Sequence, residues 1–218
     1  MEWMDTKTAK KIFEVNAIGP LTVTNAFLPL LRISSGRVVI VSSAAGRVSV
    51  PGMGAYCMTK HAATALADVL RCELRQWGIT VHDIQPGFFR TNLTNPESKT
   101  QEMESAWFQL PEDIRALYGQ KYFEKCQMIM RYLLEGVLMS KNTYKVVDNL
   151  QDAVVGKSPK NVYRPGLRSK LIHILVYLTA IDRLFVWIML LTLKAEINEA
   201  KTKLTEDVTA DKARRNND

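Results

Sequence analysis

Tyr56 and Lys60 are the two residues of this sequence whose types and spacing best suit chemistry. They stand four positions apart, so on a helix both side chains share one face. A free tyrosine keeps its proton up to a pH of about 10 and is a poor base at neutral pH. A neighbouring ammonium favours the phenolate and so lowers the pKa of the tyrosine towards the range of a general acid or base. The pair alone is a weak signal, because a chain with 7 tyrosines can meet this spacing by chance.

Three further features gather at one end of a predicted sheet. Ser43 follows the apolar run 37–41, and Pro86-Gly87 follows a second predicted strand at 79–84. A continuous apolar run such as 37–41 is typical of a parallel strand that is covered on both faces. Open parallel sheets bind their ligands beyond the carboxyl ends of the strands. Asn16 lies on the predicted helix that leads into the first strand, so it can approach the same crevice.

Strands and helices alternate along the chain, and this order predicts an α/β fold with a parallel sheet. Apolar residues at helical spacing predict four helices, at 5–31, 55–77, 111–138 and 149–155. A third strand is expected at 161–164, and the segment 42–54, rich in Ser, Gly and Ala, predicts a loop. Gly19-Pro20 predicts a kink in the first helix, and Gly78 predicts the end of the second.

In their order and spacing these pieces resemble the short-chain dehydrogenase/reductase family. The matching segments are 15–19, 36–43, 56–60 and 86–87 with Thr91. Within the family the chain is most similar to the retinol and hydroxysteroid dehydrogenase branch, with 3-hydroxybutyrate dehydrogenase also similar. That likeness rests on 28–31 and 71–78, and on Trp107, Leu110-Pro111 and Tyr118-Gly119, which resemble the segment covering the substrate.

The resemblance implies a catalytic set of four residues. Tyr56 would be the general acid/base that exchanges a proton with the substrate oxygen, and Ser43 would hydrogen-bond that oxygen as charge develops on it. Lys60 would lower the pKa of Tyr56, and Asn16 would hold a water in the proton relay. The alternatives are a simple turn serine at Ser43 and an ordinary polar helix residue at Asn16.

The resemblance also implies a nicotinamide cofactor, NAD or NADP, which carries the hydride. Tyr56 and Lys60 would lie against the nicotinamide ribose, and Pro86, Gly87 and Thr91 would contact the nicotinamide end. The alternative for Thr91 is that it serves only as an ordinary helix cap. The sequence does not distinguish the two cofactors, because the residue that reads the 2′-phosphate would follow a strand missing from this chain.

Family members begin with a strand, a Gly-rich turn and a helix whose N-terminus holds the pyrophosphate, and we find none of these here. We therefore expect the C-terminal half of a Rossmann-type doubly wound parallel sheet, with a C-terminal apolar helical segment. The strand at 37–41 would have an open edge. The isolated chain would bind NAD or NADP weakly, as a fragment or truncated isoform.

Composition is that of an ordinary globular protein, with 47% hydrophobic and 23% charged residues. We expect a partial dehydrogenase domain at 1–166, an apolar segment at 167–194 and a polar tail at 195–218. Three cysteines are an odd number without metal-ligand spacing, so we expect free thiols in a reducing compartment and no metal site.

The chain has a net charge of +7. Five basic residues stand in a stretch without acids directly before the apolar run 171–193: Lys157, Lys160, Arg164, Arg168 and Lys170. This placement favours lipid headgroups over nucleic acid. Asp182-Arg183 divides the run, so shallow attachment is favoured over a simple crossing, with a core or dimer helix as the alternative. The endoplasmic reticulum is the expected membrane, with mitochondrial or cytoplasmic placement as alternatives.

Two hypotheses about function follow. The first is an NAD(P)-dependent oxidoreductase that acts on a lipophilic alcohol or ketone, such as a retinoid or a steroid. The second is a catalytically inactive remnant that acts through a membrane, a second copy of itself or a full-length relative. An in-frame coding sequence for a Gly-rich turn upstream of Met1 would favour the first hypothesis. The substrate and the direction of the reaction stay open.

We predict that the basic cluster and the apolar run attach the chain to membranes together. Each basic residue near an anionic surface contributes about 1 kcal/mol, and the aliphatic side chains would enter the acyl boundary. The full chain should stay with the membrane fraction after a carbonate or high-salt wash, and deletion of 171–193 should release it. A monodisperse, freely soluble full chain would contradict this prediction.

Overall fold

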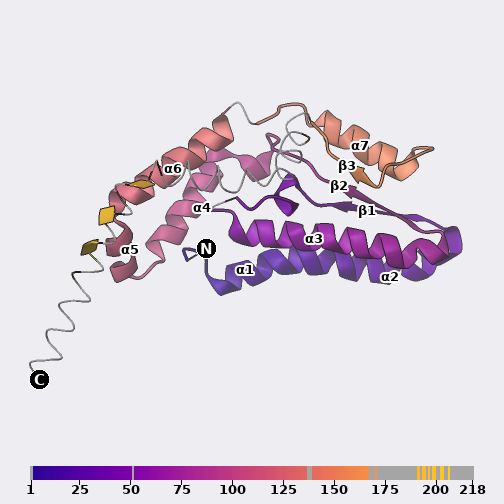
Figure 1. Ribbon diagram of the computed structural model, residues 1–218, viewed down its shortest axis with the longest axis horizontal. Coiled ribbons are helices and arrows are strands. Elements are labelled where there is room, and N and C mark those ends of the chain that lie inside the picture. The colour runs from indigo at the N-terminus through magenta and orange to yellow at the C-terminus, as the bar shows by residue number, and fades with distance from the viewer. Residues whose placement is uncertain are drawn as a thin grey trace, which may run out of the picture. The chain divides into compact units, whose positions relative to one another are not determined.

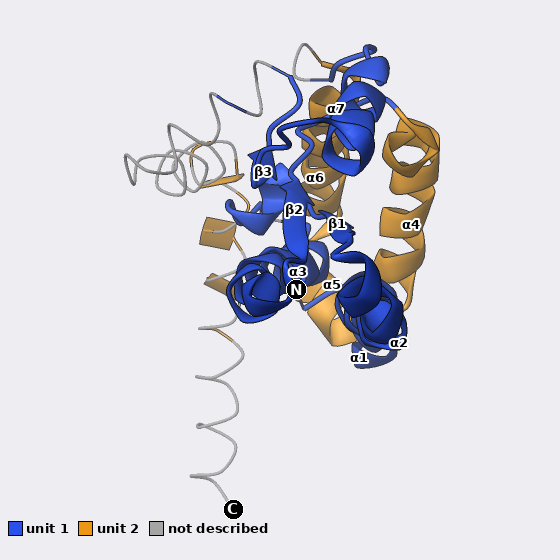
Figure 2. Cartoon of the chain, turned by 90° about the vertical axis from the view of Figure 1, so that its right-hand side faces the viewer, with its two compact units in different colours: residues 1–90, 138–183 blue, residues 91–137, 184–218 orange. Residues whose placement is uncertain are grey.

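The computed structural model describes residues 2–50, 52–136, 139–166, 170 and scattered positions from 191 to 206. The chain divides into two compact units (Figure 2). Unit 1 comprises Met1–Arg90 and Leu138–Arg183, and unit 2 comprises Thr91–Val137 and Leu184–Asp218. The domain boundaries expected at 166–167 and 194–195 border residues outside the described ones and stay predictions.

The sheet of unit 1 has three parallel strands in the order β1-β2-β3. These strands are β1 (Arg37–Val41), β2 (Thr80–Ile84) and β3 (Val162–Tyr163). The three strands expected from the sequence are thereby confirmed. β1 pairs with β2 in a register that sets Val41 level with Ile84. Within the described part of the chain, β1 is an edge strand.

The first helix is continuous but not uniform. It comprises α1 (Thr6–Phe13), a π-helical turn η1 (Glu14–Ile18) and α2 (Gly19–Ser34). Gly19-Pro20, where a kink is expected, opens α2 directly after the π-helical turn, so the regular helix is interrupted next to this pair. A bend of the helix axis there stays a prediction.

The second helix is α3 (Gly54–Glu73), followed by the 3₁₀ turn η3 (Leu74–Trp77). Gly78 closes this turn with a φ of 68°, as its place in the sequence predicts. The loop before α3 contains a second 3₁₀ turn, η2 (Ala44–Gly46). In unit 1, α1–α2 and α3 cover one face of the sheet and α7 (Tyr144–Val155) covers the other (Figure 1). α7 begins earlier than the predicted helix at 149–155.

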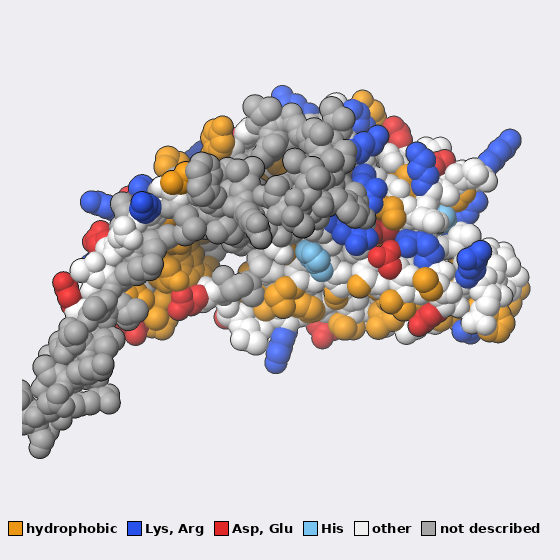
Figure 3. Space-filling view, in the orientation of Figure 1, with side chains coloured by type: hydrophobic (Ala, Val, Ile, Leu, Met, Phe, Trp, Pro, Cys, Tyr) orange, Lys and Arg blue, Asp and Glu red, His pale blue; other side chains and the backbone are white. Residues whose placement is uncertain are grey.

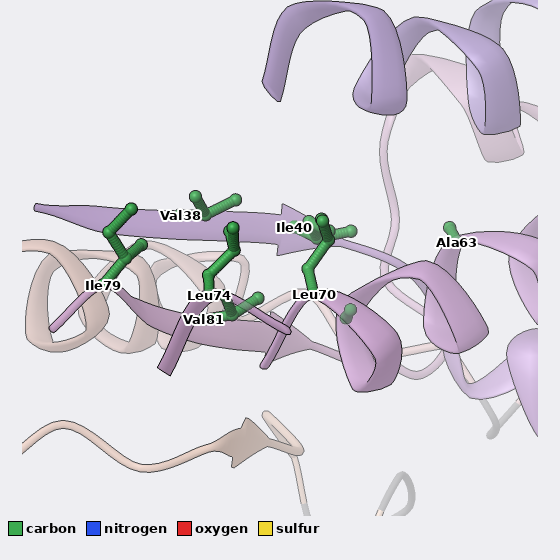
Figure 4. Packing of buried hydrophobic residues seen from close by; sticks show 8 residues of the cluster. Val38, Ile40, Ala63, Leu70, Leu74, Ile79 and Val81 are labelled. Carbon is green, nitrogen blue, oxygen red and sulfur yellow. The ribbon is translucent and has the colours of Figure 1, made fainter. Parts of the chain in front are cut away.

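The main core lies between the sheet and α3 (Figure 4). Alternate residues of β1 and β2 point towards α3, because successive side chains of a strand face opposite ways. These strand residues and the helix residues that they meet are buried: Val38, Ile40, Val81, Ala63, Ala67, Leu70 and Leu74. The core on the other face of the sheet is smaller, and there Ile84 and Tyr163 pack with Ala153 of α7.

Unit 2 is helical in its described part. Its elements are η4 (Asn92–Thr94), α4 (Pro96–Phe108), α5 (Glu112–Tyr118) and α6 (Gln120–Glu135). The helical region expected at 111–138 is confirmed in its described part, where Gly119, at a φ of 81°, divides it into α5 and α6. Trp107 of α4 stacks on Phe123 of α6, with 4.8 Å between the ring centroids.

Several large apolar side chains lie on the outer surface of the helical layer, where Figure 3 shows hydrophobic atoms along the helices. Val15, Phe27, Leu30 and Ile33 are each more than half exposed. The apolar segment 171–193 falls, except for Leu191 and Leu193, outside the described residues. Among the helices that the structure describes, none is long and apolar enough to cross a membrane.

We predict that Leu70→Ala lowers the free energy of unfolding by about 2–5 kcal/mol, because it leaves a cavity between α3 and the sheet. Urea unfolding followed by circular dichroism measures the change. Val69→Ala, on the exposed side of the same helix, is the matched control and should change stability by less than about 1 kcal/mol. Equal losses in the two variants would contradict the assignment of the core.

Candidate active site

Tyr56 and Lys60 lie on α3 and face the carboxyl end of β1. The ammonium nitrogen of Lys60 is 5.7 Å from the centroid of the Tyr56 ring. The same nitrogen donates a hydrogen bond of 3.0 Å to the carbonyl oxygen of Val41. The amide of Ser42 donates to Ile84 of β2, so by alternation the Val41 carbonyl points towards the open edge of β1. Lys60 therefore satisfies an edge carbonyl and keeps two of its three donors.

Ser43 lies where β1 ends, as predicted, and its side chain reaches Tyr56. The Ser43 hydroxyl accepts a hydrogen bond of 3.1 Å from the amide of Ala45, which caps η2. A side-chain hydrogen bond between Ser43 and Tyr56 acts to lower the pKa of the tyrosine. Ser43 is thus a turn residue and a neighbour of the phenol at once.

Asn16 lies in the π-helical turn η1, and its side chain reaches α3. Its amide nitrogen Nδ2 donates a hydrogen bond of 3.2 Å to the hydroxyl of Thr59. Thr59 in turn donates to the backbone carbonyl of Tyr56, at 2.8 Å. π-Turns are uncommon and frequent at functional sites, because they turn side chains away from the regular helical positions. Asn16 is therefore tied to the tyrosine through one intermediate residue, and its predicted role in holding a water stays a prediction.

Burial dominates the electrostatics of the pair. It raises the pKa of Tyr56 above its ordinary value, against the lowering effect of the Ser43 hydrogen bond. Burial lowers the pKa of Lys60, and the charge of Asp83 opposes that change. In the ligand-free protein both groups are therefore pushed towards their neutral forms. The expected lowering of the Tyr56 pKa by Lys60 is not the net effect here, and it stays a prediction for the ligand-bound site.

Pro86 and Gly87 follow β2 at the same end of the sheet. The Pro86 carbonyl accepts a hydrogen bond of 2.8 Å from the amide of Ala44, so the segments after β1 and β2 are joined directly. The structure thus places Ser43, Tyr56 and Pro86-Gly87 around one edge of unit 1. Thr91 belongs to unit 2, where it caps η4, and its contact with a cofactor stays a prediction.

Sequence reasoning missed three residues beside the pair. Thr59 is fully buried and relays Asn16 to the Tyr56 backbone. Ser42 and Asp83 are buried and share a hydrogen bond of 2.5 Å. A carboxylic acid within the predicted strand 79–84 was the available signal, because a charged residue in a covered strand is costly without a partner.

All three cysteines are free thiols, as expected, and the described residues include no cluster of His, Cys, Asp and Glu that could hold a metal ion. The fold and the site together define an α/β protein in which a tyrosine, a lysine and a serine gather at the carboxyl end of a parallel sheet.

Comparison with known proteins agrees with this class. The family model described as short chain dehydrogenase matches residues 1–102. Human 17-beta-hydroxysteroid dehydrogenase type 6 is 37% identical over 174 residues, which cover 79% of this chain and 54% of that protein. Mouse retinol dehydrogenase 5 is 34% identical over 190 residues, covering 86% of this chain and 59% of that protein. Over the matched residues the chain is therefore similar to short-chain dehydrogenases, including hydroxysteroid and retinol dehydrogenases.

Solved structures agree on the fold. A short-chain dehydrogenase from Streptomyces avermitilis has a TM-score of 0.60 at 25% identity, covering 87% of this chain and 64% of that one. A dehydrogenase from Burkholderia phymatum, solved in complex with NAD, has a TM-score of 0.54 at 20% identity, covering 82% and 59%. The chain spans little more than half the length of the two curated relatives.

The raised pKa of Tyr56 gives a prediction about stability at alkaline pH. A raised folded-state pKa means that the protein favours the neutral phenol. The resulting stability is present below a pH of about 10 and is lost as the pH rises through the folded value. Tyr56→Phe cannot ionise, so its stability relative to the natural protein should increase between about pH 9 and about pH 11.

Urea unfolding at the two pH values measures this difference. Tyr132→Phe, at a side chain that is 76% exposed, is the matched control and should keep a constant difference from the natural protein. A constant difference for Tyr56→Phe as well would show that the phenol is not buried as described.

Proposed function

We propose that this chain is the catalytic part of an NAD(P)-dependent oxidoreductase that acts on a lipophilic alcohol or ketone, such as a retinoid or a steroid. The observation that carries the proposal is the convergence of Tyr56, Ser43 and Lys60 at the carboxyl end of β1. The names of relatives support the substrate class, because they are a hydroxysteroid and a retinol dehydrogenase.

Each residue of the set has a task that its surroundings suit. The Tyr56 hydroxyl would give a proton to the oxygen of a ketone or take one from an alcohol. Ser43, which acts to lower the pKa of Tyr56, would donate to the same oxygen as negative charge develops on it. Burial excludes water from the phenol, so a nearby positive charge acts on it more strongly than it would in solvent. Asn16 would hold a water through its place beside Thr59.

The residues present fit the nicotinamide end of the cofactor. Lys60 has two donors left beside the one that binds Val41, and a ribose offers two hydroxyl acceptors to them. Pro86-Gly87 lies at the same end of the sheet, within reach of a ligand bound beyond the strands. When bound, the cofactor supplies or accepts the hydride. The choice between NAD and NADP stays open.

Attachment to an endoplasmic reticulum membrane remains part of the proposal, because a lipophilic substrate would be delivered from the bilayer. The basic residues before 171 support it, with mitochondrial and cytoplasmic placement as alternatives. A second copy or a full-length relative is the alternative partner, and an inactive remnant is the alternative function.

The proposed oxidoreductase activity is tested by removing the hydroxyl group of Tyr56. In the gene product that contains this chain, Tyr56→Phe should lower turnover of retinol or a hydroxysteroid at least about 100-fold, because it removes the acid–base group. Turnover is followed by the absorbance of NADH or NADPH, and circular dichroism checks that the fold is kept. Tyr144→Phe, at an exposed tyrosine of α7, is the matched control with unchanged turnover.

Two outcomes would count against the proposal. Retention of more than a few per cent of turnover in Tyr56→Phe would sink the assignment of the acid–base residue. A gene product that neither binds NAD or NADP in calorimetry nor turns over any of these alcohols would favour the inactive remnant.

A further inference from the structure

Asp83 occupies a position in β2 where an apolar residue would ordinarily be found. Its neighbours along the strand face are Val81 and Gln85, and it lies level with Ile40 of β1. The side chain is completely buried between the sheet and α3. A buried carboxylate is costly unless hydrogen bonds and a counter-charge offset the loss of water.

Two side chains donate hydrogen bonds to the Asp83 carboxylate. The Ser42 hydroxyl donates to Oδ1 at 2.5 Å, and Gln85 donates from Nε2 to Oδ2 at 2.6 Å. Such short distances are typical of hydrogen bonds to an ionised acceptor, and both donors favour the ionised form. Gln85 in turn accepts from Nε of Arg164, at 3.3 Å. The Asp83 carboxylate is thus part of a hydrogen-bond network of side chains.

The Ser42 end of this network reaches the active site on both sides. The residue before it, Val41, offers the carbonyl that binds Lys60, and the residue after it, Ser43, carries the hydroxyl beside Tyr56. Because Asp83 fixes the Ser42 side chain, it fixes the part of the backbone that presents both groups.

Burial is the largest effect on the pKa of Asp83 and raises it, and the hydrogen bonds from Ser42 and Gln85 lower it. Among the nearby charges, Asp68 of α3 raises this pKa, and Arg47, from the turn after η2, lowers it. Asp68 and Arg47 also form an ion pair with each other at 3.3 Å. His82, which precedes Asp83 in β2, is hydrogen-bonded to the Lys160 carbonyl and to Thr80.

The charge of Asp83 also opposes the effect of burial on Lys60. Burial lowers the pKa of Lys60, and the charge of Asp83 acts to raise it. In the described part of the chain Lys60 forms no ion pair with a carboxylate.

We propose that Asp83 is a positioning residue for the Tyr56–Lys60 pair: it holds Ser42 at the end of β1, between the Val41 carbonyl that binds Lys60 and the Ser43 hydroxyl. The consequence for catalysis rests on the proposed function, but the effect on Lys60 does not. An uncharged amine at Lys60 would neither favour the phenolate nor donate three hydrogen bonds. Asp83 touches no reacting atom and acts through Ser42 and Lys60.

The test is the protonation of Lys60, read without turnover. Acetic anhydride acetylates only uncharged amines, so the rate at Lys60 relative to the exposed Lys7, measured by peptide mass spectrometry, reports its charge. In the full chain, Asp83→Asn keeps the shape but removes the charge. We expect Lys60 to react about tenfold faster near neutral pH, which corresponds to a pKa lower by about one unit.

Asp152→Asn is the matched control. The Asp152 carboxylate accepts from the Tyr163 hydroxyl at 2.6 Å, so the same chemistry is removed at α7, on the other side of the sheet. The Lys60 rate should not change in this variant. An unchanged Lys60 rate in folded Asp83→Asn, or an equal rise in both variants, would overturn the proposal.

Ser42→Ala keeps the test decisive if Asp83→Asn does not fold. It removes one donor from the carboxylate, which makes Asp83 harder to ionise and so weakens the counter-charge. Faster labelling of Lys60 supports the proposal, and unchanged labelling overturns it. In an active gene product, Asp83→Asn should also begin to lose activity at a lower alkaline pH. If Tyr56→Phe keeps turnover, the proposed function fails while the labelling result stands by itself.

Discussion

The parallel pairing of β1 with β2 is the interaction on which the rest of unit 1 depends. Its register sets the two carboxyl ends level, and the hydrogen bond from Ala44 to Pro86 continues the pairing one step beyond the strands. Because the segments after β1 and β2 leave the sheet at the same edge, Ser43 and Pro86-Gly87 become neighbours. α3 then returns along the sheet and brings Tyr56 to this edge. Without this register the residues of the candidate site would be separate surface residues.

The sequence allowed these parts to be predicted because they follow from periodicity and from the geometry of parallel sheets. Runs of β-branched residues identified β1 and β2, and Gly78 marked the end of η3. The convergence of Ser43 and Tyr56 followed from the rule that ligands bind beyond the carboxyl ends of strands. These signals are local, and each depends on a few neighbouring residues.

Other features depend on tertiary contacts that no local pattern reports. The π-turn at Asn16 is accompanied by a hydrogen bond to Thr59, which is distant in the sequence. The break between α5 and α6 depends on the conformation of Gly119, and a single glycine within a helical pattern is compatible with either outcome. Asp83 became interpretable only once Ser42 and Gln85 were seen to surround it.

In the described part of the chain, β1 has no strand on its outer side, and this bears on the position of Lys60. The Val41 carbonyl is the group that an added strand would use for pairing, and it is the group that now holds Lys60. Strand addition at this edge and the release of Lys60 are therefore linked equilibria. By reciprocity, anything that draws Lys60 away from Val41 makes the edge more receptive to a strand, and a docked strand makes the ammonium more available to a ligand.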